Sequence, residues 1–434
     1  MDPVILTAII LFGSFFLLLF IGVPIAVSIG ISSLIAGITL VPLDMIAFSS
    51  AQKIFQGINS FTLLAVIFFM LSGSIMNNGG IAVRLVNLAK LIVGRLPGSL
   101  DHTNVVGNML FGSISGSAVA STAAIGSVMT PLQKKEGYDP SFSAAVNITS
   151  SPSGLLIPPT GAFIIYSLVS GGTSISALFM AGYIPGIMMG LSVMVLVYWN
   201  AKKKKYPVTE WPTLKEALKI VLQAIPSLSL VIVVIGGIIG GIFTATEGAA
   251  VSVLYSLILA LCYRQLKWSH ISTIVKETVV MTGIVLFLVG VSNIMSWVMT
   301  YSGMPRAITD LLLSVSEDPI IILLLMNIIL LVIGTFMDIT PGILIFTPIF
   351  LPIAMEVGMD PVHFGVVLVF NLAIGVSSPP VGSTLFIGSS IAGVRLESTF
   401  VPILKIYIPI IISLLLVTYF PWFSLFLPKL FGLM

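Results

Sequence analysis

Two stretches with the same unusual pattern of glycine and proline decide how this chain folds. Residues 154–163 read GLLIPPTGAF, and residues 375–384 read GVSSPPVGST, 221 positions later. Each stretch places two prolines and two glycines inside an otherwise apolar segment. Proline has no N–H and cannot continue an α-helix, so each stretch predicts a helix that is broken near its middle. The same break at a fixed offset indicates an internal repeat.

The composition predicts that both broken helices lie in a membrane. The 434 residues are 57% hydrophobic and only 8% charged, whereas a soluble domain carries about 25% charged residues. Several apolar runs exceed the roughly 20 residues that span a bilayer as a helix. The alternating pattern of an outer-membrane barrel is absent from the sequence. We therefore expect an all-α polytopic membrane protein without a separate soluble domain.

Several classes of function are disfavoured by missing motifs. The single Cys262 excludes an intramolecular disulfide, and the sequence has no HExxH, no GxSxG and no phosphate-binding loop. The net charge of +3 does not suggest nucleic-acid binding. The start, MDPVILTAII, has no basic region ahead of its apolar run, so we expect this run to stay as a membrane helix. The histidines stand beside loop signals and are predicted to be solvated or interfacial: His102, His270 and His363.

The repeat keeps its register without a gap over about 30 residues. Its matches fall on glycine, proline and aspartate rather than on common apolar residues, which argues against chance similarity. It divides the chain into a first repeat at 1–200, a connector at 201–221 and a second repeat at 222–434. Matched pairs include Gly137/Gly358, Asp139/Asp360, Pro140/Pro361, Gly154/Gly375, Pro158/Pro379, Pro159/Pro380 and Gly161/Gly382.

Each repeat is predicted to contain the same parts in the same order. These are scaffold helices, an amphipathic arm, an apolar pair bent at its middle, a broken helix and a final helix. In the first repeat the scaffold helices occupy 1–80, the arm 81–101, the bent pair together with the broken helix 102–172, and the final helix 176–199. In the second repeat the scaffold helices occupy 222–299, the arm 303–317, the bent pair together with the broken helix 319–393, and the final helix 401–425.

The bent pairs are predicted to be re-entrant hairpins. Segment 102–134 has GSISGS at its centre, at residues 112–117. As one straight helix it would be about 50 Å long at 1.5 Å per residue, which is too long for a hydrocarbon core of about 30 Å. Segment 319–356 has the same form, with GTFMDITPG at residues 334–342. Thr340 followed by Pro341 predicts the N-cap and first residue of its returning arm.

The charges support this topology. If both hairpins return to their side of entry and each broken helix crosses once, 16 of the 19 Lys and Arg residues share one side. The positive-inside rule makes that side cytoplasmic. About eleven transmembrane helices result, with both termini periplasmic and the two repeats inverted. An inverted repeat with paired broken helices indicates a secondary transporter whose site lies near the membrane midplane.

The breaks and the hairpin tips supply neutral oxygens that suit Na⁺. Pro158 and Pro379 are predicted to free the carbonyls of Gly154 and Gly375 from helical hydrogen bonding, and Pro380 that of Val376. Free carbonyls are tolerable at membrane depth where they line a cavity or hold a cation. Gly112 and the serines after it can face the first break. The predicted Na⁺ ligands are Ser113, Ser115, Gly154, Ile157 and Pro159 at one site, and Gly334, Gly375, Ser378 and Val381 at the other. The alternative is that these small residues only permit close helix packing.

Asp338 is the one acid, apart from Glu247, that this topology places deep in the membrane. An ionisable group at such depth is costly and is by default a candidate for function. We interpret Glu247, near a short outer turn, as structural. No Arg or Lys falls at the midplane, so an anionic substrate would meet helix N-termini after Ser117 and Thr340. The predicted substrate-binding residues are Ser117, Ser153, Thr160, Asp338, Thr340 and Ser383.

Four stretches resemble a known family, the large membrane subunit of TRAP (tripartite ATP-independent periplasmic, DctM-like) transporters, over essentially the whole chain. GTFMDITPG and SVSEDPIIILLL look closest to its sialic acid branch. The stretches are GSISGSAVASTAAIGSVMTP (112–131), the EGYDP to IPPTG segment (136–161), GGIFTATEGAAV (240–251) and GTFMDITPGILIFTPIFLPIA (334–354).

The resemblance implies several properties that the residues alone do not. It implies an elevator-type carrier in the bacterial inner membrane, in which hairpins and broken helices move against a scaffold. It also implies Na⁺-coupled uptake of an organic acid, with sialic acid as the best candidate. Two partners are implied: a small four-helix membrane subunit, expected as a separate chain, and a periplasmic substrate-binding protein.

Three other readings remain open at this point. A stand-alone Na⁺/dicarboxylate-type symporter of the same architecture would need no binding protein. A channel could also be built from broken helices and hairpins. An intramembrane aspartyl protease would need two acids in proximity, and only Asp338 is well placed, so we expect no enzymatic activity.

Overall fold

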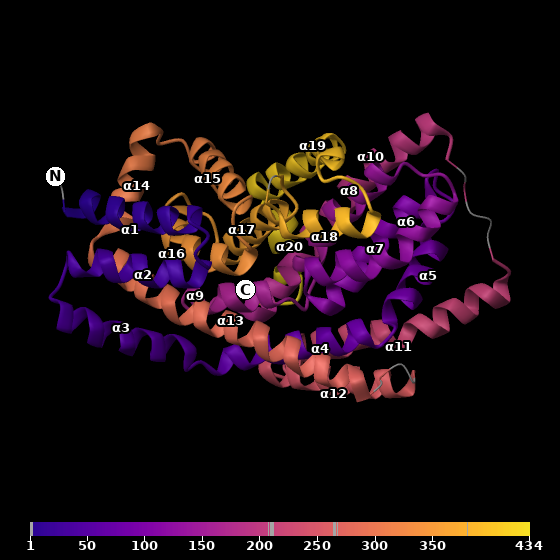
Figure 1. The fold of residues 1–434 in the computed structure, drawn as a ribbon, viewed down its shortest axis with the longest axis horizontal. Coiled ribbons are helices and arrows are strands. Elements are labelled where there is room, and N and C mark those ends of the chain that lie inside the picture. The colour runs from indigo at the N-terminus through magenta and orange to yellow at the C-terminus, as the bar shows by residue number, and fades with distance from the viewer. Residues whose placement is uncertain (1–2, 207, 209–211, 264–265, 267, 380) are drawn as a thin grey trace.

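The computed structural model describes residues 3–206, 208, 212–263, 266, 268–379 and 381–434. The described residues fold into helices with short connections, as Figure 1 shows. The first repeat contains α1 (Pro3–Phe20), α2 (Ile25–Ile38), α3 (Leu43–Ile58), α4 (Phe61–Asn78), α5 (Ile81–Val93), α6 (Ser99–Ser115), α7 (Ala118–Lys135), α8 (Pro140–Ser150), the 3₁₀ helix η1 (Ser151–Leu155), α9 (Gly161–Val169) and α10 (Ile175–Lys204).

The second repeat follows the same plan with different breaks. Its counterpart of α3 and α4 is one uninterrupted helix of 34 residues, α13, whereas Asn59 and Ser60 separate the two helices in the first repeat. Its helices are α11 (Leu214–Ile239), α12 (Ala245–Cys262), α13 (Trp268–Tyr301), α14 (Met304–Val315), α15 (Pro319–Gly334), α16 (Ile339–Glu356), α17 (Pro361–Val376), α18 (Ser383–Ala392), α19 (Glu397–Tyr419) and α20 (Trp422–Leu430).

Reciprocal packing relates the two repeats by an approximate two-fold axis. α7 packs on α18 while α9 packs on α16, and α8 packs on α19 while α17 packs on α10. Such exchanged contacts are what a two-fold relation between equivalent parts produces. Where α10 meets α19, the hydroxyls of Ser192 and Ser413 are hydrogen-bonded at 2.5 Å, and these residues are 221 positions apart. Equivalent residues in contact mark the axis, as expected from the repeat in the sequence.

The scaffold helices interlock across the repeats. α4 packs along α12, and α13 packs along both α2 and α3. The 16 residues of α3, within the scaffold predicted at 1–80, include Asp44, Gln52 and Lys53 and are less apolar than a membrane span. Eight helices in the described part of the chain are long and apolar enough to cross a membrane, namely α1, α4, α10, α11, α12, α13, α16 and α19.

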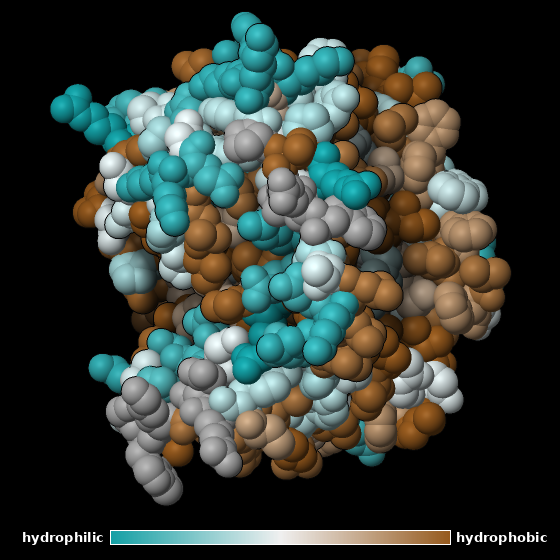
Figure 2. Space-filling model, turned by 90° about the vertical axis from the view of Figure 1, so that its right-hand side faces the viewer, coloured by the Kyte–Doolittle hydropathy of each residue, from teal (hydrophilic) through white to brown (hydrophobic). Residues whose placement is uncertain are grey.

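Basic residues gather at one end of the molecule. Figure 1 places α5, the end of α10 and the start of α11 on the right, far from the N-terminus. Figure 2 views this end, where hydrophilic residues spread over the upper left and the centre and hydrophobic residues are concentrated on the right-hand side. α10 continues to Lys204, so Lys202, Lys203 and Lys204 lie in its last turn. The final helix predicted at 401–425 is interrupted after Tyr419, and α20 follows.

Candidate functional site

The first hairpin touches the first broken helix through glycine backbones. α6 ends at Ser115, Gly116 takes the left-handed conformation with φ +61°, and Ser117 caps α7 by accepting a hydrogen bond from the Ala120 N–H at 3.2 Å. A Cβ added to Gly112 would lie 2.5 Å from the Cα of Gly154. No side chain fits between them, so the hairpin tip and the break are in direct backbone contact.

The second repeat makes the equivalent contact. A Cβ added to Gly375 would lie 2.4 Å from both the carbonyl carbon and the oxygen of Gly334. The connection between α15 and α16 is short, and Asp338 caps α16 by accepting the Ile339 N–H at 2.9 Å. The prediction that Thr340 is the N-cap was therefore wrong, because the helix begins one residue before it. Both glycine pairs join a hairpin to the broken helix of its own repeat.

At the first contact, the serine hydroxyls are used within the hairpin. The Ser113 hydroxyl donates to the carbonyl of Leu110 at 2.8 Å, and the Ser115 hydroxyl accepts from the Ser117 N–H at 3.4 Å. Pro159 lies beside the tip, because its carbonyl oxygen would be 3.5 Å from a Cβ added to Gly116. Ile157 packs instead against Gly186 on α10. The structure thus brings Gly154 and Pro159 to the hairpin tip and turns Ile157 toward a neighbouring helix.

At the second contact, two carbonyls expected to be free have partners. The Gly375 carbonyl accepts the Ser378 N–H at 2.9 Å, and the Val376 carbonyl accepts the Thr384 hydroxyl at 3.1 Å. The prediction that Pro379 frees the Gly375 carbonyl was wrong, because the chain tightens into a turn there. The corresponding prediction for Pro380 rests on a residue outside the described part of the chain. Val381 is 47% exposed.

Tyr407 is a site residue that the sequence did not reveal. Its hydroxyl, carried on α19, is hydrogen-bonded to the hydroxyls of Ser377 at 3.1 Å and Ser378 at 2.9 Å. It also donates to the Ile374 carbonyl at 3.2 Å. The position 221 residues earlier is Gly186, so the first repeat has no equivalent hydroxyl. The two breaks are therefore chemically different despite their shared backbone contact.

The residues predicted to bind substrate fall into two groups. Ser117 and Thr160 cap α7 and α9, and a Cβ on Gly116 would lie 3.8 Å from the Cα of Thr160. Two helix N-termini therefore meet, which is an arrangement that favours an anion. Ser153 lies apart from them, fully buried, and its hydroxyl donates to the Ser150 carbonyl at 2.6 Å.

The second group belongs to the second repeat. Ser383 begins α18, and its hydroxyl oxygen is buried without a partner among the described residues. Thr340 is half-buried in the first turn of α16. Asp338 is exposed to the outside of the protein rather than enclosed by it. Its carboxylate is thus placed to meet solvent or a ligand as well as to cap its helix.

Buried asparagines attach the first hairpin to its broken helix, and the sequence reasoning did not single them out. The Asn108 amide donates to the Asn147 side-chain oxygen at 3.0 Å and to the Ser150 hydroxyl at 2.8 Å. In the second repeat, the Asn371 amide donates to the Asn327 oxygen at 2.7 Å. Amides in apolar membrane segments form hydrogen bonds between helices, so four asparagines in such segments were the available signal.

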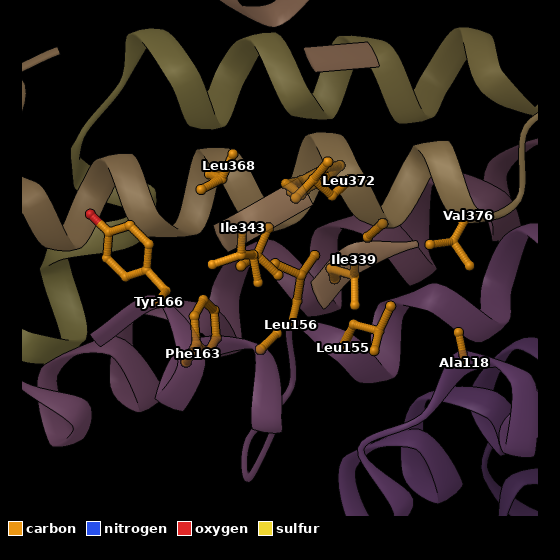
Figure 3. Close-up of a cluster of buried hydrophobic side chains, with 14 of the residues drawn as sticks. Ala118, Leu155, Leu156, Phe163, Tyr166, Ile339, Ile343, Leu368, Leu372 and Val376 are labelled. Atoms are coloured by element: carbon orange, nitrogen blue, oxygen red, sulfur yellow. The ribbon is translucent and has the colours of Figure 1, made fainter. Parts of the chain in front are cut away.

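A hydrophobic layer joins the two repeats behind the glycine contacts. Figure 3 shows Leu155 and Leu156, at the end of η1, facing Ile339 and Ile343 of α16. Phe163 and Tyr166 of α9 lie in the same layer, with Leu368, Leu372 and Val376 of α17 above them. The Tyr166 hydroxyl donates to the Pro361 carbonyl at 2.6 Å. This layer fixes the two breaks relative to each other.

Three buried ionisable residues contradict the sequence-based expectations. His102 and His363 are each 1% exposed rather than solvated, and His363 Nε2 lies 2.7 Å from the Val417 carbonyl oxygen. Asp101 is also 1% exposed and is enclosed by helices, whereas Glu247 and Asp338, the acids predicted to lie deep, are both exposed. Asp101 and His102 lie in the first turn of α6, beside loop signals in the sequence. They are nevertheless buried, because α5, α7, α8 and α10 pack around α6.

Two repeats that each carry a hairpin and a broken helix have the architecture of a membrane transporter. The sequence profile of the DctM component of tripartite ATP-independent periplasmic transporters matches residues 12–423. The chain therefore belongs to this family of large permease subunits, and the resemblance seen in its motifs is confirmed.

Individual relatives cover nearly the whole chain, and one solved structure shares its fold. The chain is 52% identical to YgiK of Salmonella typhimurium, over 98% of each chain. It is 38% identical to the sialic acid TRAP transporter large permease SiaM of Vibrio cholerae, over 95% of this chain and 96% of SiaM. It is also 38% identical to the C4-dicarboxylate large permease DctM of Pseudomonas aeruginosa, over 89% and 90%. The Alcanivorax borkumensis YdaH transporter shares the fold, with a TM-score of 0.61 at 14% identity over 88% and 89% of the two chains.

Proposed function

We propose that this permease drives Na⁺-coupled uptake of an organic acid across the bacterial inner membrane. The observation that carries the proposal is the pair of equivalent glycine contacts, Gly112 with Gly154 and Gly334 with Gly375. Each contact brings the backbone of a hairpin against a break in a helix, where the carbonyl oxygens depart from the regular helical hydrogen-bond pattern. Neutral carbonyl and hydroxyl oxygens are suitable ligands for a monovalent cation.

The two proposed Na⁺ sites differ in their supporting groups. The first would use carbonyls near Gly154 and Pro159 with the hairpin at Ser113 and Ser115. The second would use Gly334 and Gly375 with Ser378, whose hydroxyl is oriented by Tyr407. Because only the second site has an aromatic hydroxyl at its edge, we expect the two sites to bind Na⁺ with different affinities.

We propose sialic acid as the substrate, with a C4-dicarboxylate as the second candidate. Identity does not separate them, since the Vibrio cholerae SiaM and the Pseudomonas aeruginosa DctM are both 38% identical to this chain. Both substrates carry a carboxylate, which the meeting N-termini of α7 and α9 suit. The substrate hydroxyls of a sugar acid would find hydrogen-bonding groups at Ser383 and Asp338.

We further propose an elevator movement and two partners. The hydrophobic layer and the asparagine contacts hold the hairpins and broken helices together, whereas α4 with α12 and α13 with α2 and α3 form a separate interlocked scaffold. Movement of the first unit against the second would carry the site across the membrane. A small four-helix membrane subunit and a periplasmic binding protein would complete the transporter, and both chain termini would face the periplasm.

Substrate choice is tested by competition in proteoliposomes that contain this permease and its small subunit. Labelled sialic acid is supplied with its binding protein and an inward Na⁺ gradient, and unlabelled succinate is added in excess. Our proposal predicts saturable sialic acid uptake that succinate does not inhibit. No sialic acid uptake, with succinate uptake through its own binding protein, would replace the substrate and keep the mechanism.

A further inference from the structure

A buried carboxyl lies at the base of the first hairpin, away from both glycine contacts. Asp101, in the first turn of α6, is 1% exposed. Its Oδ1 accepts two hydrogen bonds, from Gln133 Nε2 of α7 at 2.9 Å and from the Ser143 hydroxyl of α8 at 2.8 Å. Its Oδ2 has no hydrogen-bond partner among the described residues. One carboxyl oxygen thus joins three helices, and the other is left bare.

A small cavity lies beside the two donors. Its volume is about 10 Å³, which is close to the space that one water molecule needs. Besides Gln133 and Ser143, its wall includes Lys134, Tyr138 and Ala392, the last from α18 of the other repeat. Separation of α18 from this end of α7 and α8 would therefore open the base of the hairpin to water.

The surrounding charges do not neutralise Asp101. Asp139 is paired with Lys204 at 2.8 Å, so that lysine is already engaged. Among the described residues, no hydrogen bond or ion pair joins the His102 ring to Asp101. A buried carboxylate without a paired cation is strongly disfavoured, and protonation removes the charge. The charged and titratable groups on the elements around this end include Lys90 on α5, His102 on α6, Lys134 and Lys135 on α7, Glu136, Tyr138 and Asp139 before α8, Lys204 on α10 and Tyr206 just after it.

We propose that the base of the first hairpin is a proton-binding site, at which Asp101 carries a proton on Oδ2 while α6, α7, α8 and α18 are packed together. The proton leaves to water when this base opens, and the negative charge then remains on Oδ1 and Oδ2. The site is separate from the proposed Na⁺ sites. It gives the permease a pH-sensitive step that does not depend on which substrate is carried.

Infrared difference spectroscopy on the permease purified with its small subunit tests the proposal without any transport assay. The spectrum is followed from about pH 5 to about pH 9, the range over which buried carboxyls can titrate. We expect a protonated-carboxyl C=O band that disappears as the pH rises in the wild-type protein and is missing in Asp101→Asn. Asp310→Asn, at an exposed acid on α14, is the matched control and should keep the band.

Thermal unfolding provides a second readout. A carboxyl that holds its proton more tightly in the folded than in the unfolded state makes stability fall as the pH rises toward its folded pKa. Asp101→Asn should therefore flatten the dependence of the melting temperature on pH, whereas Asp310→Asn should not. An unchanged band and an unchanged pH dependence in Asp101→Asn would overturn the proposal.

Ser143→Ala keeps the test decisive if Asp101→Asn does not fold. Removing this hydroxyl takes one hydrogen-bond donor away from the carboxylate, which destabilises the ionised form relative to the protonated form. The titration midpoint of the infrared band should then move to higher pH. A midpoint that stays at the wild-type value would show that the band does not come from Asp101.

Discussion

Replacing Gly375 with alanine should disable the second hairpin contact, because the added methyl group has no space. Its Cβ would lie 2.4 Å from the carbonyl carbon and oxygen of Gly334 and 2.5 Å from its Cα. All three are backbone atoms, so no side chain can rotate away. An ordinary carbon contact is about 3.5–4.0 Å, and the α15–α16 tip must therefore retreat by roughly 1 Å.

The cost of this retreat can be estimated from core overpacking. Inserting a methyl group into a well-packed core costs about 1–3 kcal/mol. If that cost falls on the Na⁺-binding arrangement, Na⁺ affinity drops by about 5- to 150-fold. The assay is the Na⁺ concentration dependence of labelled sialic acid uptake in proteoliposomes. We expect a higher half-saturating Na⁺ concentration, with expression and detergent-solubilised yield close to wild type.

Two other glycines serve as controls. A Cβ on Gly334 approaches the Gly375 Cα only to 3.2 Å, so Gly334→Ala should have a much smaller effect than Gly375→Ala. A Cβ on Gly236 in α11 meets nothing within 4 Å, so Gly236→Ala should be neutral or slightly stabilising. Wild-type Na⁺ dependence in Gly375→Ala, or equal losses in all three variants, would refute the reasoning.

Three further predictions concern side chains around the site and at the basic end of the molecule. Tyr407→Phe removes the hydroxyl that is hydrogen-bonded to Ser378. A lost hydrogen bond costs about 1 kcal/mol, so the half-saturating Na⁺ concentration should rise about fivefold in the same uptake assay. An unchanged value would show that Tyr407 does not contribute to the Na⁺ site. Asp338→Asn keeps an N-cap of similar strength, whereas Asp338→Ala loses about 1 kcal/mol of capping free energy. If uptake is lost in both variants, transport depends on the negative charge of Asp338. If uptake is lost only in the alanine variant, transport depends on the helix cap. Burial raises the pKa of Asp139, but the hydrogen bonds from Lys204 and from backbone N–H groups outweigh it and hold this pKa below its ordinary value. The pair with Lys204 therefore stabilises the fold above about pH 4 and loses its effect as the pH falls further. Because both side chains are about 40% exposed, Lys204→Met should cost less than about 1 kcal/mol in thermal unfolding at neutral pH; a melting loss that persists unchanged at acidic pH would contradict this origin.

The backbone plan of the site could be predicted from sequence because it depends on residues with special backbone properties. Glycine and proline restrict or permit conformations in ways that do not depend on distant partners. The repeated glycine and proline positions therefore identified the breaks, and length identified the hairpins. The Gly112–Gly154 and Gly334–Gly375 contacts follow from that plan, and the offset of 221 reappears in the hydrogen bond between Ser192 and Ser413.

The side-chain chemistry could not be predicted to the same degree, because it depends on which helices pack together. Tyr407 reaches Ser378 only because α19 crosses α17 at that level. Asp101 and His102 stand at a helix start, where sequence alone predicts exposure, but neighbouring helices bury them. The N-cap of α16 is Asp338 rather than the predicted Thr340. Both residue types are good N-caps, and which one caps the helix depends on the geometry of the turn before it.

The most direct test of the central claim is uptake of labelled sialic acid into proteoliposomes that contain this chain and its small membrane subunit. The inward Na⁺ gradient and the soluble binding protein are varied independently. We predict saturable uptake that requires both. Uptake that proceeds without the binding protein would instead establish a stand-alone symporter, and uptake that is indifferent to the Na⁺ gradient would contradict the role assigned to the two glycine contacts.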